Sequence, residues 1–151
     1  MSDSFVYRTY TIRGNRTSVR DRITERLIKN GYVLKNDTGA VRFFRYPKIL
    51  FSSKRPLTCI SRLSLDVMEK NTGSSVKIGV TFTKIRYFTI GIMLLVCVVV
   101  PVITGIIKYG IPDIPPVSYL GIPLGFMLHY HVRAKAFRAL KRLVYSVEDN
   151  V

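Results

Sequence analysis

Residues 87–107 read YFTIGIMLLVCVVVPVITGII and contain no charged side chain. Arg86 comes directly before this stretch and Lys108 directly after it. A helix of about 20 apolar residues crosses the ~30 Å hydrocarbon core of a bilayer, because each residue advances ~1.5 Å. The stretch therefore predicts a transmembrane helix, and every other segment must be assigned to a place relative to the membrane.

The composition agrees with a membrane protein that has a basic cytoplasmic side. Hydrophobic residues make up 48% of the 151 residues, and 24 Lys and Arg stand against 9 Asp and Glu, for a net charge of +15. The first residues, MSDSFVYRTYTIRGNR, are polar and basic and lack the apolar core of a secretory signal. We expect the segment before the apolar stretch to stay in the cytoplasm.

The charge distribution divides the chain into three parts. Residues 1–86 are strongly basic and predict a cytoplasmic domain, residues 87–132 are nearly uncharged, and residues 133–151 are basic again. Within the middle part, residues 117–132 form a second apolar segment after a short loop rich in Pro and Gly. We expect a two-helix transmembrane hairpin with spans at 87–107 and 117–132, a kink at Pro101, and then a basic amphipathic C-terminal helix.

Residues 1–86 have the pattern of a small α+β domain. Residues 5–13 are rich in β-branched and aromatic side chains, and Val19, Ile23 and Leu27 then recur at the spacing of one helical face. Alternating segments follow, separated by Asn- and Gly-containing turns. The order predicts an antiparallel sheet of about five strands with one helix on one face.

The basic residues next to the apolar segments predict the orientation. Lys84 and Arg86 precede the first segment, a basic cluster follows the second, and the loop between them has one Lys and one Asp. The positive-inside rule places both termini in the cytoplasm, in a multi-pass protein of the cell membrane.

Two groups of cations are candidate contacts for an anionic ligand or for acidic lipid. For the first group, on the helix of the N-terminal domain, a solvated helix face is the simpler interpretation. The second group follows the second apolar segment, on a helix that continues the span, lies on the inner leaflet or docks on the N-terminal domain. The first group is Arg20, Arg22 and Arg26, and the second is Arg133, Lys135, Arg138, Lys141 and Arg142.

Gly121 and Gly125 form a G-x-x-x-G pattern, which lets helix backbones approach closely. We expect packing against the first span, with self-association between protomers as the alternative. Residues 42–46, RFFRY, interleave cations with aromatic rings as nucleic-acid-binding sheets do. Attraction to an anionic inner leaflet explains the basic domain better, so nucleic acid is the less favoured partner.

Residues with catalytic spacing are lacking. The chain has no P-loop, no G-x-S-x-G and no paired carboxylates that would serve as acid and base. His129 and His131 lie two apart, so on a helix they point away from one another and do not converge on a metal. No cofactor, metal site or catalytic residue is predicted.

These observations favour a non-enzymatic integral membrane protein whose cytoplasmic domain binds or positions a partner within a homo- or hetero-oligomer. The alternative is a membrane-tethered sensor whose basic domain binds an anionic ligand such as a nucleotide and rearranges the transmembrane hairpin.

Overall fold

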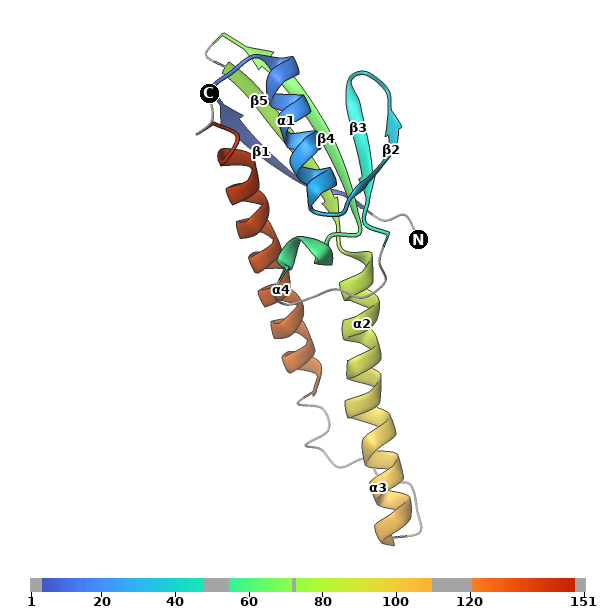
Figure 1. Ribbon diagram of the computed structural model, residues 1–151. Coiled ribbons are helices and arrows are strands. Elements are labelled where there is room, and N and C mark those ends of the chain that lie inside the picture. The colour runs from blue at the N-terminus through green and yellow to red at the C-terminus, as the bar shows by residue number, and fades with distance from the viewer. Residues whose placement is uncertain (1–3, 48–54, 72, 110–120, 149–151) are drawn as a thin grey trace.

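The computed structural model describes residues 4–47, 55–71, 73–109 and 121–148, which form a sheet domain and two long helices that extend from it (Figure 1). The C-terminal helix lies along the sheet domain and continues beyond it beside the other long helix (Figure 1). The elements in chain order are β1 (Val6–Ile12), α1 (Arg16–Lys29), β2 (Val33–Asp37), β3 (Val41–Arg45), the 3₁₀ turn η1 (Pro56–Cys59), β4 (Arg62–Lys70), β5 (Gly73–Thr81), α2 (Thr83–Leu94), the π-helical turn η2 (Leu95–Val99), α3 (Val100–Tyr109) and α4 (Gly121–Tyr145).

The predicted α+β class and the antiparallel sheet are confirmed. The five strands pair in the order β1-β5-β4-β3-β2, and every neighbouring pair is antiparallel. In the β4–β5 hairpin, Leu65 lies opposite Ile78, and the same register sets Leu63 against Val80. These side chains are fully buried, because residues that alternate along both strands fall on one face of the sheet.

Helix α1 follows its predicted pattern. Val19, Ile23 and Leu27 are buried against the sheet. The Asn15 side chain accepts the Thr17 N–H at 3.2 Å and caps the first turn. Gly31 has a positive φ of 89°, in the left-handed conformation that ends many helices.

The sequence predicted one helix on this face of the sheet, whereas α1 and α4 both cover it. Helix α4 packs beside α1 with its second half, and a line of apolar side chains along that half is buried in the same core as α1. The line continues into the turn after the helix and consists of Ala136, Leu140, Leu143, Val144 and Val147. Of the three interpretations of the C-terminal helix, the structure shows docking on the N-terminal domain, by a helix that is continuous from Gly121 in the second apolar segment.

The predicted two-helix transmembrane hairpin is wrong. In the described part of the chain one helix is long and apolar enough to cross a membrane, the continuous run Thr83–Ile107, with a mean hydropathy of 2.9 and 11% of its apolar window buried. In α4 only Gly121 to Val132 is free of acidic and basic side chains apart from two histidines. Those residues extend for about 18 Å, too short for the ~30 Å core. Residues 117–120 of the expected second span lie outside the described residues.

The first half of α4 nevertheless lies directly against α2 and η2. A Cβ atom on Gly121 would come within 2.5 Å of the Cys97 sulfur, and one on Gly125 within 2.5 Å of Met93. The two glycines are buried between the helices while Leu124 and Met127 are exposed. The G-x-x-x-G pattern therefore faces the first apolar helix of the same chain, at Met93 and Cys97.

The backbone irregularity expected at Pro101 lies one turn earlier. Pro101 has no N–H, and its ring would clash with a carbonyl four residues back in a regular helix. The preceding turn, η2, is π-helical, and Val100 donates its N–H to the Leu95 carbonyl five residues back. The Thr104 hydroxyl donates to the carbonyls of Val100 and Pro101 at 2.9 and 3.0 Å. A local change of helix type thus accommodates the proline.

A cysteine at position 121 tests the approach of α4 to η2. Gly121→Cys should form a disulfide with the native Cys97 on mild oxidation in detergent, because the new Cβ already lies near that sulfur. Peptide mapping by mass spectrometry measures the yield. Ile122→Cys, on the exposed side of the same turn, is the control and should remain mostly unlinked. Equal yields from both variants would contradict the packing.

Truncation of a buried α4 side chain tests whether this helix belongs to the domain core. Leu140→Ala should lower the free energy of unfolding by about 2–5 kcal/mol, because it leaves a cavity where the side chain is fully buried. Arg138→Ala, an exposed change on the same helix, should stay within about 0.5 kcal/mol. Urea unfolding of the full chain in mild detergent measures both. A Leu140→Ala cost as small as that of Arg138→Ala would mean that α4 is not docked.

Candidate functional site

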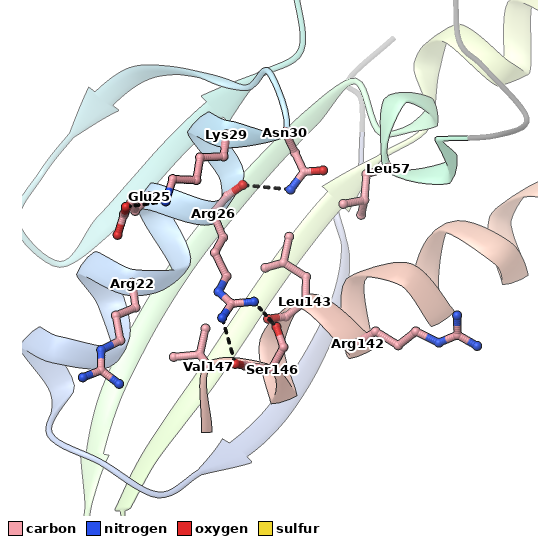
Figure 2. A pocket seen from close by; sticks show the side chains of 10 residues that line it. All are labelled: Arg22, Glu25, Arg26, Lys29, Asn30, Leu57, Arg142, Leu143, Ser146 and Val147. Atoms are coloured by element: carbon pink, nitrogen blue, oxygen red, sulfur yellow. Dashed lines mark hydrogen bonds and ion pairs between the residues drawn. The ribbon is translucent and has the colours of Figure 1, made fainter. Parts of the chain in front are cut away.

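An open groove of about 710 Å³ separates α1 from the end of α4 (Figure 2). Cations line its rim, one carboxylate accompanies them, and apolar side chains form part of its wall. The lining residues are Arg22, Glu25, Arg26, Lys29, Asn30, Leu57, Arg142, Leu143, Ser146 and Val147. We call this cavity the basic groove.

Three cations on one face of α1 line one side of the basic groove. Arg22, Arg26 and Lys29 are four and three positions apart, so they lie on one face over two turns. Arg142, in the last turn of α4, lines the groove on the other side, with its side chain directed away from α1 (Figure 2). Figure 2 shows the Arg22 and Arg142 side chains on opposite sides of Arg26. The groove is therefore lined by cations from two elements.

Arg26 joins the two walls of the basic groove. Its guanidinium donates to the Ser146 hydroxyl at 2.5 Å and to the Ser146 carbonyl at 3.0 Å (Figure 2). Ser146 follows the end of α4, where helix carbonyls lack partners within the helix and the dipole is negative. The contact thus satisfies a C-terminal carbonyl, and it fixes the position of Arg26 in the floor of the groove.

Glu25 partly balances the positive rim. Its carboxylate accepts a hydrogen bond from Lys29 at 2.8 Å, and both side chains are largely exposed. The hydrogen bond from Lys29, followed by the charges of Lys29 and Arg26, lowers the pKa of Glu25. The carboxylate stays ionised at neutral pH, so four cations and one anion are among the residues that line the groove.

Arg20 lies on another face of α1 and does not contribute to the basic groove. It donates to the Gly39 carbonyl at 2.5 Å, in the turn between β2 and β3. Beside it, Arg42 forms ion pairs with Asp21 and Asp37, each at 2.7 Å. The sequence grouped Arg20 with Arg22 and Arg26, whereas the structure uses Arg20 and Arg42 to attach α1 to the β2–β3 hairpin.

The cations of α4 are separated in the same way. Arg142 reaches the basic groove, and Arg133 lies over the Phe82 ring with its guanidinium carbon 5.2 Å from the centroid. Lys141 lies 5.7 Å from the Tyr145 ring centroid, and Lys135 and Arg138 are exposed. These five cations therefore do not form one surface.

The aromatic and basic run 42–46 does not form an open stacking surface. Phe44 and Tyr46 are buried in the core, and Arg42 is held by its two ion pairs. Phe43 lies on the opposite face, 6.5 Å from the Phe5 ring. The side chains that suggested a nucleic-acid surface are thus mostly buried in the core or held in ion pairs.

Sequence reasoning missed Lys29 and Ser146 in the basic groove. Lys29 follows Arg22 by seven positions, so helical spacing alone would have included it. Ser146 is 120 positions from Arg26, and no local pattern signals that contact. In the part of the chain that the structure describes, no three His, Cys, Asp or Glu side chains gather as metal ligands.

No protein-family model, no curated protein and no solved structure matches this sequence.

The Asp37 ion pair makes the attachment of α1 sensitive to acid. The Gly39 N–H at 2.9 Å and then Arg42 lower the pKa of Asp37 below its ordinary 3.8. A lowered carboxyl pKa stabilises the fold above the unfolded-state value, and this is lost as pH falls through the folded-state value. Asp37→Asn should therefore be less stable than wild type at neutral pH, and the difference should shrink below pH 3.8. Chemical unfolding at several pH values measures it, and a difference independent of pH would contradict this role.

Proposed function

We propose that this chain is a membrane-anchored, non-enzymatic adaptor that holds an acidic segment of a partner protein in the basic groove. The observation that carries the proposal is the arrangement of Arg22, Arg26, Lys29 and Arg142 on two elements around one open cavity. Complementary charge steers a partner to such a surface and sets its register. The apolar side chains of Leu143 and Val147 in the same cavity suit a segment that also carries an apolar residue.

The exposed apolar surface of Thr83–Ile107 supports membrane anchoring. Side chains along the whole helix are exposed, from Phe88 at 48% through Leu94 at 57% to Ile107 at 80%. Apolar patches larger than a few hundred Å² are rare on soluble monomers. Lys84 and Arg86 at the start of this helix support a cytoplasmic position for the sheet domain, by the positive-inside rule.

The first half of α4 supports assembly with other membrane subunits. Phe126, Met127 and Tyr130 are exposed by 67%, 71% and 75%, on the side of α4 away from α2. Apolar side chains at this density need lipid or another protein to cover them. A homo- or hetero-oligomer in the membrane would supply that cover, and the rigid docking of α4 on the domain would link such an assembly to the basic groove.

Charge reversal in the basic groove tests the adaptor function. The full chain carrying Arg22→Glu and Arg142→Glu should lose a partner that co-purifies with wild type in mild detergent. We expect a weakening of roughly tenfold, because two attractive contacts of about 0.2–1 kcal/mol each become repulsive. Quantitative mass spectrometry of the co-purified proteins measures the loss, and binding of the same partner should weaken as salt rises.

Lys135→Glu with Arg138→Glu is the matched control, because it makes the same change in charge at two exposed positions outside the groove. A partner lost from the groove variant and kept by the control supports the proposal. Identical sets of co-purified proteins from wild type and both variants would overturn it.

A small anionic ligand in the same groove is the second candidate, favoured by the four cations among its lining residues. A nucleotide should then raise the thermal midpoint of the purified full chain. The rise should vanish in the Arg22→Glu, Arg142→Glu variant and persist in the control variant. No shift with any nucleotide would exclude this candidate.

A further inference from the structure

The face of the sheet opposite α1 and α4 carries a row of residues that begins and ends with an aromatic ring. Strand register places Tyr7, Gly79, Ser64 and Phe43 side by side across β1, β5, β4 and β3. Strand neighbours of this row, such as Val80, are buried in the core under the helices, so alternation puts the row itself on the other face. We call this side of the sheet the open face.

The Tyr7 ring lies directly against the sheet and remains half exposed. A Cβ atom on Gly79 would come within 2.7 Å of a carbon of this ring, so the ring packs onto the glycine backbone. Tyr7 is nevertheless 54% exposed. The Phe5 ring centroid is 6.1 Å from that of Tyr7 and 6.5 Å from that of Phe43. These three rings form an aromatic platform across the open face.

Cations flank the aromatic platform on both sides. In the next row toward α2, Arg45 lies directly opposite Arg62, and both are exposed. On the other side, the Lys77 ammonium lies 4.9 Å from the Tyr7 ring centroid, and Asp66 is opposite Lys77. Like charges directly opposite one another destabilise a sheet, and no carboxylate of the described residues forms an ion pair with either arginine. An anion bound over the two arginines would remove their repulsion.

The combination of rings and cations fits single-stranded nucleic acid better than other polyanions. The phosphates of such a strand suit the cations, and its unpaired bases stack on exposed aromatic rings. Acidic lipid headgroups supply the negative charge but no planar ring for Tyr7. The contact between Lys77 and Tyr7 is weaker than the stacking of a base on the same ring, so a base can displace it.

We propose that the open face binds single-stranded nucleic acid. Bases stack on the aromatic platform, and phosphates contact the flanking cations. Of the run 42–46, Phe43 and Arg45 take part, whereas β1, β4 and β5 supply the rest of the surface. The open face lies on the opposite side of the sheet from the basic groove, and its binding does not depend on the proposed adaptor function.

Fluorescence anisotropy with the full chain in a non-ionic detergent provides the test. The probe is a labelled oligouridylate of about 12 nucleotides, and an oligothymidylate and a DNA duplex of the same length are compared with it. The net charge of +15 attracts any polyanion, so heparin serves as a competitor without bases. We expect the single strands to bind roughly tenfold more tightly than the duplex at the same salt concentration, because only their bases are free to stack. Binding of the oligouridylate alone identifies an RNA site, and equal binding of both single strands identifies a site for either.

Three sets of variants locate the effect. Tyr7→Ala should weaken binding about tenfold and Tyr7→Phe should restore it, because stacking needs the ring and not the hydroxyl. Arg45→Gln with Arg62→Gln should reduce the slope of log affinity against log salt by about 1.4, since each phosphate contact contributes about 0.7. The unbound protein should become no less stable, because the change removes a repulsive pair. Lys135→Gln with Arg138→Gln removes the same charge on α4 and should bind as wild type does.

Equal affinity for single strand, duplex and heparin would overturn the proposal, because it would show attraction to net charge alone. Unchanged binding by Tyr7→Ala would overturn it as well. Displacement of the probe by polyglutamate or by phosphatidylserine in the micelles, as readily as by unlabelled RNA, would assign the face to an acidic segment or to lipid instead. If Tyr7→Ala does not fold, the arginine double variant and its lysine control decide the question. Residues of the basic groove are unchanged in all of these proteins, so the adaptor function is measured separately.

Discussion

The packing of the second half of α4 into the sheet domain is the constraint on which the rest of this structure depends. Leu140 and Val144 are fully buried, in a core that otherwise belongs to α1 and the sheet. That docking fixes the axis of α4, and with it the position of every side chain along the helix. Arg142 lines the basic groove and Arg133 lies over the Phe82 ring, and one helix carries both.

The same helix couples the sheet domain to the apolar helix. Gly121 and Gly125 let the first half of α4 lie against Met93 and Cys97, while β5 runs into α2 with only Phe82 between them. The chain therefore connects domain and apolar helix at two places.

Particular residues show how far sequence reasoning extends. Val19, Ile23 and Leu27 predicted α1, and the alternation along β4 and β5 predicted a hairpin, because local periodicity and burial coincide there. The second transmembrane span was predicted from apolar composition alone, and that prediction was wrong. Periodicity shows that residues from Gly121 onward have an apolar side, but it does not show what covers that side. Sequence proximity also grouped Arg20 with Arg22 and Arg26. It could not show that Arg20 bonds to the β2–β3 turn and so lies on another face of α1.

By itself the sequence determined the α+β class, the antiparallel strands, helix α1 and the long apolar helix, because these follow from side-chain periodicity and composition over short stretches. The tertiary structure decided that α4 is a core helix and that Arg26 and Ser146 meet across 120 positions. Contacts of this kind depend on how separate elements pack. Uncharged residues 87–107 now belong to a helix that begins at Thr83, with α4 packed along one side of it.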